Sequence, residues 1–451
     1  MHVEIIETPG LGDRSYVVSH DRVAIVIDPQ RDLDRVYAKL SDETSVTHVL
    51  ETHVHNDYVT GGLELARRCG AAYVLSAADP VTFDRVGVSE GDMLGSGELR
   101  VEVMETPGHT PHHVAYVVSC GGQRAVFTGG SLLYGTVGRT DLIGEEMTEE
   151  LSRHQHRTAR RLTHELPSEA AVCPTHGFGS FCASAGSGEG RQRSTIGEEI
   201  VQNVACTAAD EDAFVQVLLA GLDAYPRYYA HMAPVNRAGP APLDLSPPHD
   251  VAPGTLEKRR RAGEWIVDVR ARSDFAAAHL PGSVNVELAD QLATYLGWIL
   301  PWGTPVTFLA DDAEATAEAQ RMVARIGIDR PAGRAVGDLE SHLGGMAPRS
   351  YPLVDFPELA RVARDRDTAI LDVRRNGEWR EHHLADALHI PLHELSERMH
   401  EVPVGEVWVH CKSGYRAAIA ASLLDAAGRS PVLIDDDYDR ASEVGMALVF
   451  G

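Results

Sequence analysis

The sequence predicts a multidomain chain of the α/β and α+β classes, with a large N-terminal block followed by two smaller α/β units. Its 451 residues accommodate about three domains of ordinary size. A proline-rich stretch at 233–254 disfavours helix and central strand and suits a connector. An internal repeat follows this stretch. We therefore expect domains at 1–245, 246–350 and 351–451.

The composition argues against several classes of protein. A formal net charge of -25 disfavours a general nucleic-acid binder, which needs a basic face. No window approaches the ~20 apolar residues that span a bilayer, and Val3–Ile6 resembles a first strand rather than an export signal. Six cysteines, none in a Cys-x-x-Cys pair, do not form a disulfide framework in so long a chain. We expect a cytoplasmic protein with no nucleic-acid or membrane partner.

Three of four short motifs in the N-terminal block carry residues that suit metal binding. The run from Thr52 to Asp57 follows a predicted strand and places His53, His55 and Asp57 on one loop. The other motifs are Thr106-Pro107-Gly108-His109-Thr110, Val126-Phe127-Thr128-Gly129-Gly130 and Pro174-Thr175-His176-Gly177. A single histidine is more often a core or surface residue than a ligand. Four motifs in this order indicate a metal centre.

The two smaller units have parallel features. Val267-Asp268-Val269-Arg270 matches Leu371-Asp372-Val373-Arg374, and His279-Leu280 matches His383-Leu384 at the same offset. A predicted helix in each unit, at 315–326 and 417–427, ends at a glycine, which is a common helix stop. Strands that alternate with helices predict a parallel sheet in each unit.

Cys411 opens a short loop between an apolar strand at 407–410 and an alanine-rich helix. The helix directs its free N–H groups and its positive dipole end at this loop. Lys412 and Arg416 also favour the Cys411 thiolate. With Ser413, Gly414 and Tyr415, the loop can hold an anionic sulfur, a persulfide or an oxyanion. The alternatives are a buried structural cysteine and a phosphatase-type loop, which has a different arginine spacing.

The first copy of the repeat lacks this thiol. Ala310 stands where the second copy has Cys411, and Asp311, Asp312 and Glu314 occupy the equivalent loop. Three carboxylates repel an anionic substrate. We expect the first copy to be non-catalytic and to serve in packing or positioning.

The Cys411 loop, together with Asp372-Val373-Arg374 and His383-Leu384, resembles the active site of rhodanese-type sulfurtransferases. This resemblance implies that Cys411 carries the transferred sulfur as a persulfide. It also implies a catalytic Arg416 and substrate binding by the loop residues Lys412, Ser413, Gly414 and Tyr415.

The order of the four N-terminal motifs resembles the metallo-β-lactamase fold, an αββα sandwich, over about residues 1 to 230. Gly138-Arg139-Thr140-Asp141 and the fusion to rhodanese-like units are most similar to persulfide dioxygenases. That resemblance implies mononuclear Fe(II) held by two histidines and one carboxylate, with open positions for substrate sulfur and oxygen. His53 and His109 match the two histidines. Arg139 matches an arginine near the carboxylated thiol substrate and is expected to bind an anion.

The chain departs from this pattern at two positions. Gly130 stands where the family has aspartate directly after Phe-Thr-Gly, and Tyr58 replaces a histidine of many zinc hydrolases. Three alternatives follow for the centre: a site of His53, His55 and His109, a replacement carboxylate from Asp57 or Asp141, or a metal-free scaffold. His176 matches the last family histidine. We expect it to act as a hydrogen-bond partner rather than as a metal ligand.

These patterns predict an enzyme of sulfur metabolism. The N-terminal domain would oxidise a low-molecular-weight thiol persulfide with O2 to sulfite, and Cys411 would transfer sulfane sulfur, with sulfite or thiosulfate among its substrates. The resemblance also implies a homo-oligomer. The alternatives are a zinc-dependent, glyoxalase-like thioester hydrolase and a degenerate, metal-free N-terminal domain that serves the sulfurtransferase.

Overall fold

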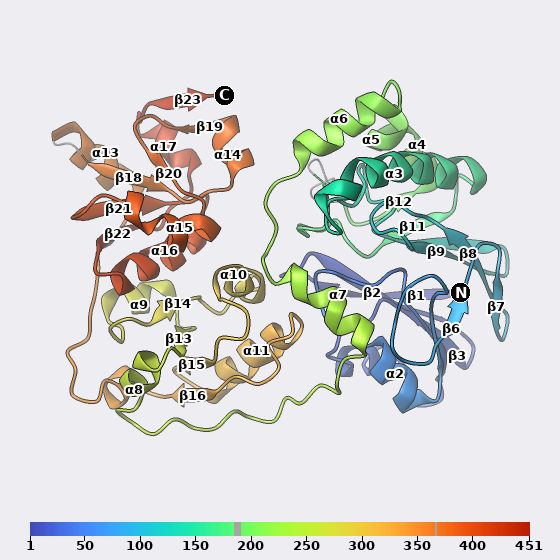
Figure 1. Cartoon of the computed structure of the whole chain (residues 1–451), viewed down its shortest axis with the longest axis horizontal. Coiled ribbons are helices and arrows are strands. Elements are labelled where there is room, and N and C mark those ends of the chain that lie inside the picture. The colour runs from blue at the N-terminus through green and yellow to red at the C-terminus, as the bar shows by residue number, and fades with distance from the viewer. Residues whose placement is uncertain (185–190, 366–367) are drawn as a thin grey trace. The chain divides into compact units, whose positions relative to one another are not determined.

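The computed structural model describes residues 1–184, 191–365 and 368–451 (Figure 1). The chain divides into two compact units, one of residues 1–243 with 324–327 and one of residues 244–323 with 328–451. No helix within the described residues is long and apolar enough to cross a membrane. The glycine-rich stretch at 184–190, which the sequence predicts to be a loop, lies mostly outside the described residues.

The first unit contains two six-stranded sheets. The first sheet has the order β1-β2-β3-β4-β5-β6, and the second has the order β12-β11-β10-β9-β8-β7. The strands of the first sheet are β1 (His2–Thr8), β2 (Asp13–His20), β3 (Val23–Ile27), β4 (Ser45–Leu50), β5 (Ala72–Ser76) and β6 (Val86–Val88). Those of the second are β7 (Met93–Ser96), β8 (Leu99–Glu105), β9 (Val114–Cys120), β10 (Gln123–Gly129), β11 (Ala171–Pro174) and β12 (Ser194–Thr195).

The two sheets pack face to face over one apolar core. Tyr16, Ile25, Val103 and Phe127 belong to this core and alternate along their strands with residues that face outward. Helices cover the outer faces (Figure 1). They are α1 (Asp34–Tyr37), α2 (Gly62–Cys69) and α7 (Tyr229–Ala238) on the first sheet, and α3 (Glu145–Glu165), α4 (Ile196–Gln202), α5 (Val204–Thr207) and α6 (Glu211–Gly221) on the second. The predicted αββα sandwich is confirmed.

The second unit contains the two copies of the repeat, each with a parallel sheet. The first sheet has the order β14-β13-β15-β16 and the second β17-β22-β21-β18-β20. The first copy comprises α8 (Leu256–Arg261), β13 (Trp265–Asp268), α9 (Arg272–Ala277), β14 (Val284–Asn285), α10 (Leu292–Ile299), β15 (Val306–Ala310), α11 (Ala313–Ala324), β16 (Gly333–Val336) and α12 (Leu339–His342).

The second copy adds a short antiparallel pair, β19 with β23, to the same plan. Its elements are β17 (Leu353–Val354), α13 (Phe356–Asp365), β18 (Ala369–Asp372), α14 (Asn376–Glu381), β19 (His382–Leu384), β20 (Leu388–His389), η1 (Leu392–Glu394), α15 (Leu395–Arg398), η2 (Met399–Glu401), β21 (Glu406–His410), α16 (Tyr415–Ala426), β22 (Ser430–Ile434), α17 (Asp439–Glu443) and β23 (Leu448–Phe450).

Side-chain contacts show that the two halves of the second unit are copies of one repeat. Arg270 binds the carboxylate of Asp268 through Nη2 at 2.6 Å, and Arg374 binds Asp372 at the same distance. His279 stacks on the ring four residues before it, at 4.1 Å between centroids, and His383 does so at 3.7 Å. These matched pairs fix the loop after the first strand of each copy.

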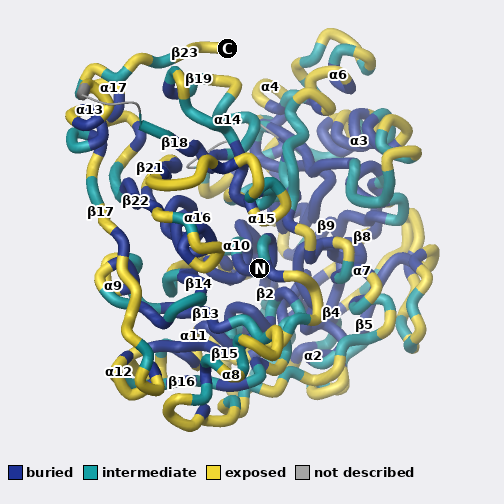
Figure 2. The backbone as a smooth tube through the Cα atoms, turned by 60° about the vertical axis from the view of Figure 1, so that its left-hand side comes forward, coloured by how far each residue is buried: buried dark blue, intermediate teal, exposed yellow. Residues whose placement is uncertain are grey.

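The two copies are joined through α16, which is buried from Tyr415 to Asp425 (Figure 2). Asp425 on this helix accepts a hydrogen bond from His279 Nε2 at 3.1 Å and pairs with Arg349 at 2.8 Å. The Tyr415 hydroxyl donates to the carbonyl of Glu287 at 2.8 Å. The first copy therefore directly supports the helix that follows the Cys411 loop.

We predict that Asp425→Ala lowers the stability of the second unit. The fully buried His279 would lose its acceptor and Arg349 its partner, at a cost of about 1–3 kcal/mol. The midpoint of urea unfolding measures this loss. Asp425→Asn, which keeps an oxygen for His279, should have a smaller effect. An unchanged midpoint in Asp425→Ala would show that the bridge contributes no stability.

Candidate functional site

The motif histidines of the N-terminal block meet at one end of the sandwich. His53 follows β4, His109 follows β8 and His176 follows β11, and each is at most 1% exposed. The ring centroids of His53 and His109 are 4.9 Å apart, and those of His109 and His176 are 5.3 Å apart. We call His53, His109 and His176 the histidine cluster.

Hydrogen bonds at Nδ1 orient all three imidazoles. His109 Nδ1 donates to the Arg139 carbonyl at 2.7 Å, and His176 Nδ1 lies 2.9 Å from Asp13 Oδ1. His53 Nδ1 is 2.9 Å from Thr52 Oγ1, whose hydroxyl donates to a carboxylate. An imidazole that donates from Nδ1 has a lone pair at Nε2 unless it is protonated. Nε2 is therefore the atom of each ring that would bind a metal, and binding would release any proton that it carries.

The Nε2 atoms of the cluster fit a transition-metal ion. Those of His53 and His176 are 3.4 Å apart, and His109 Nε2 is buried without a hydrogen-bond partner among the described residues. Ligand atoms of His53, His55 and His176 lie within 4.8 Å of one another, as do those of His109, His176 and Cys182. A buried, unpaired nitrogen is costly unless something binds it. This geometry favours His176 as a ligand, although the sequence analysis places it behind His55 and Asp57.

The Nε2 atom of His55 faces a separate group of polar side chains, and its Nδ1 is buried without a hydrogen-bond partner among the described residues. Its Nε2 lies 3.0 Å from the Tyr58 hydroxyl, 3.3 Å from Asp28 Oδ1 and 3.2 Å from Glu51 Oε2. Burial alone would lower the pKa of His55, but the two carboxylates raise it to about 9. Burial would also lower the pKa of His176, but the carboxylates of Asp57 and Asp13 raise it to about 10, so protonation does not separate His55 from the cluster. In this arrangement Tyr58, which takes the place of a family histidine, orients His55, whose ring lies 4.1 Å from that of His53 between centroids.

The nearby carboxylates serve the cluster from outside it. Asp57 Oδ2 lies 3.2 Å from His176 Nδ1. Burial would raise the pKa of Asp57, but the His176 charge lowers it. Asp141 is bound by Arg139 at 2.7 Å. The structure therefore pairs both of the alternative carboxylates with basic side chains, and their role as ligands stays a prediction.

Arg139 is almost fully buried, and its side chain is occupied within the protein. Its Nε and Nη2 bind Asp141, its Nη1 donates to the Phe181 carbonyl at 2.9 Å and its Nη2 also donates to the Asp223 carbonyl at 2.8 Å. Its guanidinium lies over the Tyr225 ring. These contacts favour a structural role, in which Arg139 positions the carbonyl that orients His109. Anion recognition by Arg139 stays a prediction.

Cys411 lies at the end of β21, as predicted, and is 2% exposed. Gly414 has a φ of +85°, and a Cβ there would overlap the carboxylate of Asp435. This left-handed turn brings the first N–H groups of α16, which have no partner within the helix, next to the thiol. The loop thus supplies the amides that an anionic sulfur requires.

The two cations of the Cys411 loop are both paired. Arg416 binds both oxygens of Glu378, at 2.5 and 2.7 Å, and Lys412 Nζ lies 2.9 Å from Asp439. Although burial opposes it, Arg416 holds the pKa of Glu378 at about 2. The surroundings of Cys411 are less positive than Lys412 and Arg416 alone predict, because Glu378 neutralises Arg416. Glu378 lies more than 30 residues before the loop, so the local motif does not reveal this pairing. The backbone amides become the main source of positive potential.

The first copy contributes an aromatic side chain beside the Cys411 loop. Tyr295 of α10 lies 5.7 Å from the Tyr415 ring, between centroids. Burial raises the pKa of Tyr295, and the positive charge of Arg416 opposes this rise. In the first copy itself, Asp312 accepts the Ala315 amide at 2.8 Å and so caps a helix. These contacts support the expectation that this copy has a positioning role.

Comparison with known proteins identifies the families. The model of the metallo-beta-lactamase superfamily matches residues 9–177, and that of the rhodanese-like domain matches residues 252–339 and 356–441. The chain belongs to the metallo-beta-lactamase superfamily and carries two rhodanese-like domains. The resemblances drawn from the sequence are therefore confirmed, and so is the predicted fold class.

The metallo-beta-lactamase domain is similar to proteins of two named activities. It is 28% identical over 211 residues to the human mitochondrial persulfide dioxygenase ETHE1, covering 46% of this chain and 74% of that protein. It is 30% identical over 185 residues to a hydroxyacylglutathione hydrolase of Cereibacter sphaeroides, covering 40% of this chain and 68% of that protein. A metallo-beta-lactamase structure from Staphylococcus aureus shares the fold, with 23% identity, a TM-score of 0.68, and coverage of 75% of this chain and 99% of that chain.

Gly130 of the metallo-beta-lactamase domain has no room for a side chain. A Cβ built at this position would overlap His109 Cδ2 and lie 2.5 Å from Cγ. Its amide donates to His113 Nε2 at 3.0 Å, and the His113 ring stacks on His53 at 4.8 Å. Sequence reasoning missed His113, although it follows the His109 motif closely. The absence of a side chain at position 130 and the position of the His109 ring therefore depend on each other.

We predict that Gly130→Ala lowers metal affinity without unfolding the domain. The added methyl would displace the His109 ring and turn its Nε2 away. We expect metal affinity to fall by about 10–100-fold, the loss that follows when the partners of metal ligands are mutated. Competition with a chelator measures the affinity. Gly95→Ala is the matched control, since its new Cβ meets only Arg100, at 3.7 Å. Equal affinity in both variants would contradict this role of His109.

Proposed function

We propose that the chain is an enzyme of sulfur metabolism that oxidises a thiol persulfide in its metallo-beta-lactamase domain and transfers sulfane sulfur through Cys411. The observation that carries the proposal is the presence, in one chain, of three buried imidazoles whose ring nitrogens lie close together and a cysteine beside the first turn of α16. The similarity to persulfide dioxygenases supports the first activity, and the rhodanese-like domains support the second. Six unpaired cysteines support a reducing, cytoplasmic compartment.

The histidine cluster would hold the metal, and we propose Fe(II). When bound, the ion supplies the redox chemistry by which a sulfur substrate and dioxygen react. Thr52, Arg139 and Asp13 each fix one imidazole at Nδ1 and so orient the ligand atoms. All three imidazoles are buried, so the centre is shielded from bulk water. Zinc is the alternative, and the relatives are consistent with either metal.

Sulfur transfer at Cys411 needs no oxidant. The Cys411 thiolate attacks the outer sulfur of a thiol persulfide or of thiosulfate, and the sulfur–sulfur bond breaks. The leaving thiolate or sulfite takes the electron pair, and Cys411 becomes a persulfide. A thiol, sulfite or cyanide then attacks the terminal sulfur and regenerates the Cys411 thiolate. The amides of the first turn of α16 face the charge that develops in both steps.

A hydrolase remains the second candidate because of the hydroxyacylglutathione hydrolase relatives. Tyr58 and Gly130 oppose it, since both replace residues associated with a dinuclear zinc centre. A metal-free domain that serves Cys411 is the third candidate. Elemental analysis of protein purified without added metal separates all three, because each predicts a different content of iron or zinc.

We predict that Cys411→Ala lowers sulfur transfer from thiosulfate to cyanide by more than about 1000-fold, because the nucleophile is removed. Thiocyanate formation measures the rate. Cys206→Ala is the matched control and should retain the wild-type rate, since Cys206 lies outside the second unit. Equal rates in wild type and Cys411→Ala would sink the transferase assignment.

We predict that His109→Ala abolishes oxygen consumption with a low-molecular-weight thiol persulfide and lowers bound iron, because a ligand is lost. Thiocyanate formation at Cys411 should remain unchanged, since it takes place in another domain. An oxygen electrode and elemental analysis provide the two measurements. His164→Ala, an exposed residue of α3, is the control. Zinc with thioester cleavage in the wild type would instead favour the hydrolase.

A further inference from the structure

Three potential metal ligands meet at the end of the sandwich opposite the histidine cluster. β2 begins at Asp13, the partner of His176, and ends at His20. β9 begins just after His113 and ends at Cys120. Strands of seven or eight residues are about 23–27 Å long at about 3.3 Å per residue. His20 and Cys120 are therefore a full strand length from the cluster.

The third member of this group is Glu98, in the turn between β7 and β8. His20 Nε2 lies 3.1 Å from Glu98 Oε2, and ligand atoms of His20, Glu98 and Cys120 all lie within 4.8 Å of one another. Bonds of about 2.0–2.3 Å to a tetrahedral ion place ligand atoms about 3.3–3.7 Å apart. The His20–Glu98 distance is already close to this range, and the sulfur of Cys120 lies within 4.8 Å of both ligand atoms.

The loops that carry these residues are well supported. Arg100 donates through Nη1 to the carbonyls of Gly97 and Leu99, at 2.7 and 3.1 Å, and so fixes the turn that contains Glu98. Cys120 pairs with Gln123 in the β9–β10 hairpin. His20 pairs with Val23 in the β2–β3 hairpin. Three rigid turns from two sheets thus present a nitrogen, an oxygen and a sulfur to one point.

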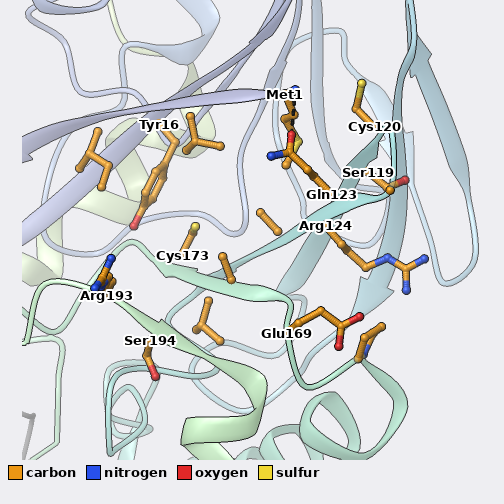
Figure 3. Close-up of a pocket in the computed structure, with 18 of the residues that line it drawn as sticks. Met1, Tyr16, Ser119, Cys120, Gln123, Arg124, Glu169, Cys173, Arg193 and Ser194 are labelled. Atoms are coloured by element: carbon orange, nitrogen blue, oxygen red, sulfur yellow. Dashed lines mark hydrogen bonds between the residues drawn. The ribbon is translucent and has the colours of Figure 1, made fainter.

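A cavity adjoins the same point. Glu98 and Cys120 are among its lining residues, and its volume is about 850 Å³ (Figure 3). In Figure 3 the Cys120 and Ser119 side chains lie near one wall, and Tyr16 and Cys173 lie on the far side. Arginines 100, 124 and 193 also line the cavity. An ion held by three protein ligands keeps a fourth position for water or an anion, and this cavity provides the space.

We propose that His20, Glu98 and Cys120 bind a divalent zinc-class ion at a second site, with the fourth position open to this cavity. Imidazole, carboxylate and thiolate together are typical ligands for Zn²⁺. Binding forms a metal–sulfur bond, and the thiol proton of Cys120 passes to solvent. The side chain of Glu98 is mostly exposed, so an ion enters from that side. The site does not depend on the proposed function of the cluster or of Cys411.

Titration with Co²⁺ tests the site, because thiolate ligation gives cobalt a charge-transfer band in the near ultraviolet. Cys182 lies near His109 and His176 and could produce the same band. The titration therefore uses the full chain with Cys182→Ser. We expect this protein to show the band and the double variant Cys120→Ser with Cys182→Ser to lose it. The matched control is Cys173→Ser with Cys182→Ser, which removes another cavity-lining thiol and should keep the band.

A ligand outside the core protects the test from misfolding. His20→Gln changes a partly exposed side chain in a hairpin, and with Cys182→Ser it should lower Co²⁺ affinity at this site by more than about 100-fold, since even an outer partner of a metal site contributes 10–100-fold. Circular dichroism confirms the fold of each variant. The proposal is overturned if the Cys182→Ser protein shows no thiolate band, if the band survives Cys120→Ser, or if His20→Gln leaves the affinity unchanged.

Discussion

One buried carboxylate, Asp28, connects the strands that carry the histidine cluster. It accepts hydrogen bonds from the amide and hydroxyl of Thr52, at 2.7 and 2.8 Å, and from the hydroxyl of Thr175. Those threonines precede His53 and His176 directly. Asp28 itself has a φ of +48°, a strained conformation for a residue with a side chain. Its hydrogen bonds compensate for that strain, and they set the distance between two of the three candidate ligands.

The two rhodanese-like domains likewise depend on contacts between them, since residues of the first domain contact the helix that follows the Cys411 loop. The first copy lacks a thiol, yet it retains the Arg270–Asp268 pair and the stacked His279 of an intact repeat. It uses His279 to bind Asp425 and Tyr295 to flank the Cys411 loop. The copy without a thiol therefore supports the copy that carries Cys411.

The fold could be predicted from the sequence, because it depends on local patterns, whereas the roles of the candidate residues stay predictions. Strand–helix alternation, the repeated Asp-Val-Arg and the order of the histidine motifs all lie in short segments. The environment of each site depends on residues distant in the chain, such as Asp13 for His176 and Glu378 for Arg416. No spacing rule connects them. His55 illustrates the difficulty, since its motif suggests a ligand, while the contacts of its Nε2 with Glu51 and Tyr58 could not be read from the motif.

The overlap between a side chain at position 130 and the His109 imidazole limits which residues this position can accept. A single codon change that introduces an acidic group at 130 would collide with the ring before it could offer an oxygen to a metal. Restoring the carboxylate would need a coordinated shift of the ring, its carbonyl partner and the stacked His113. A substitution at 130 alone would therefore not restore a carboxylate ligand, since the His109 imidazole occupies the space that the new side chain needs.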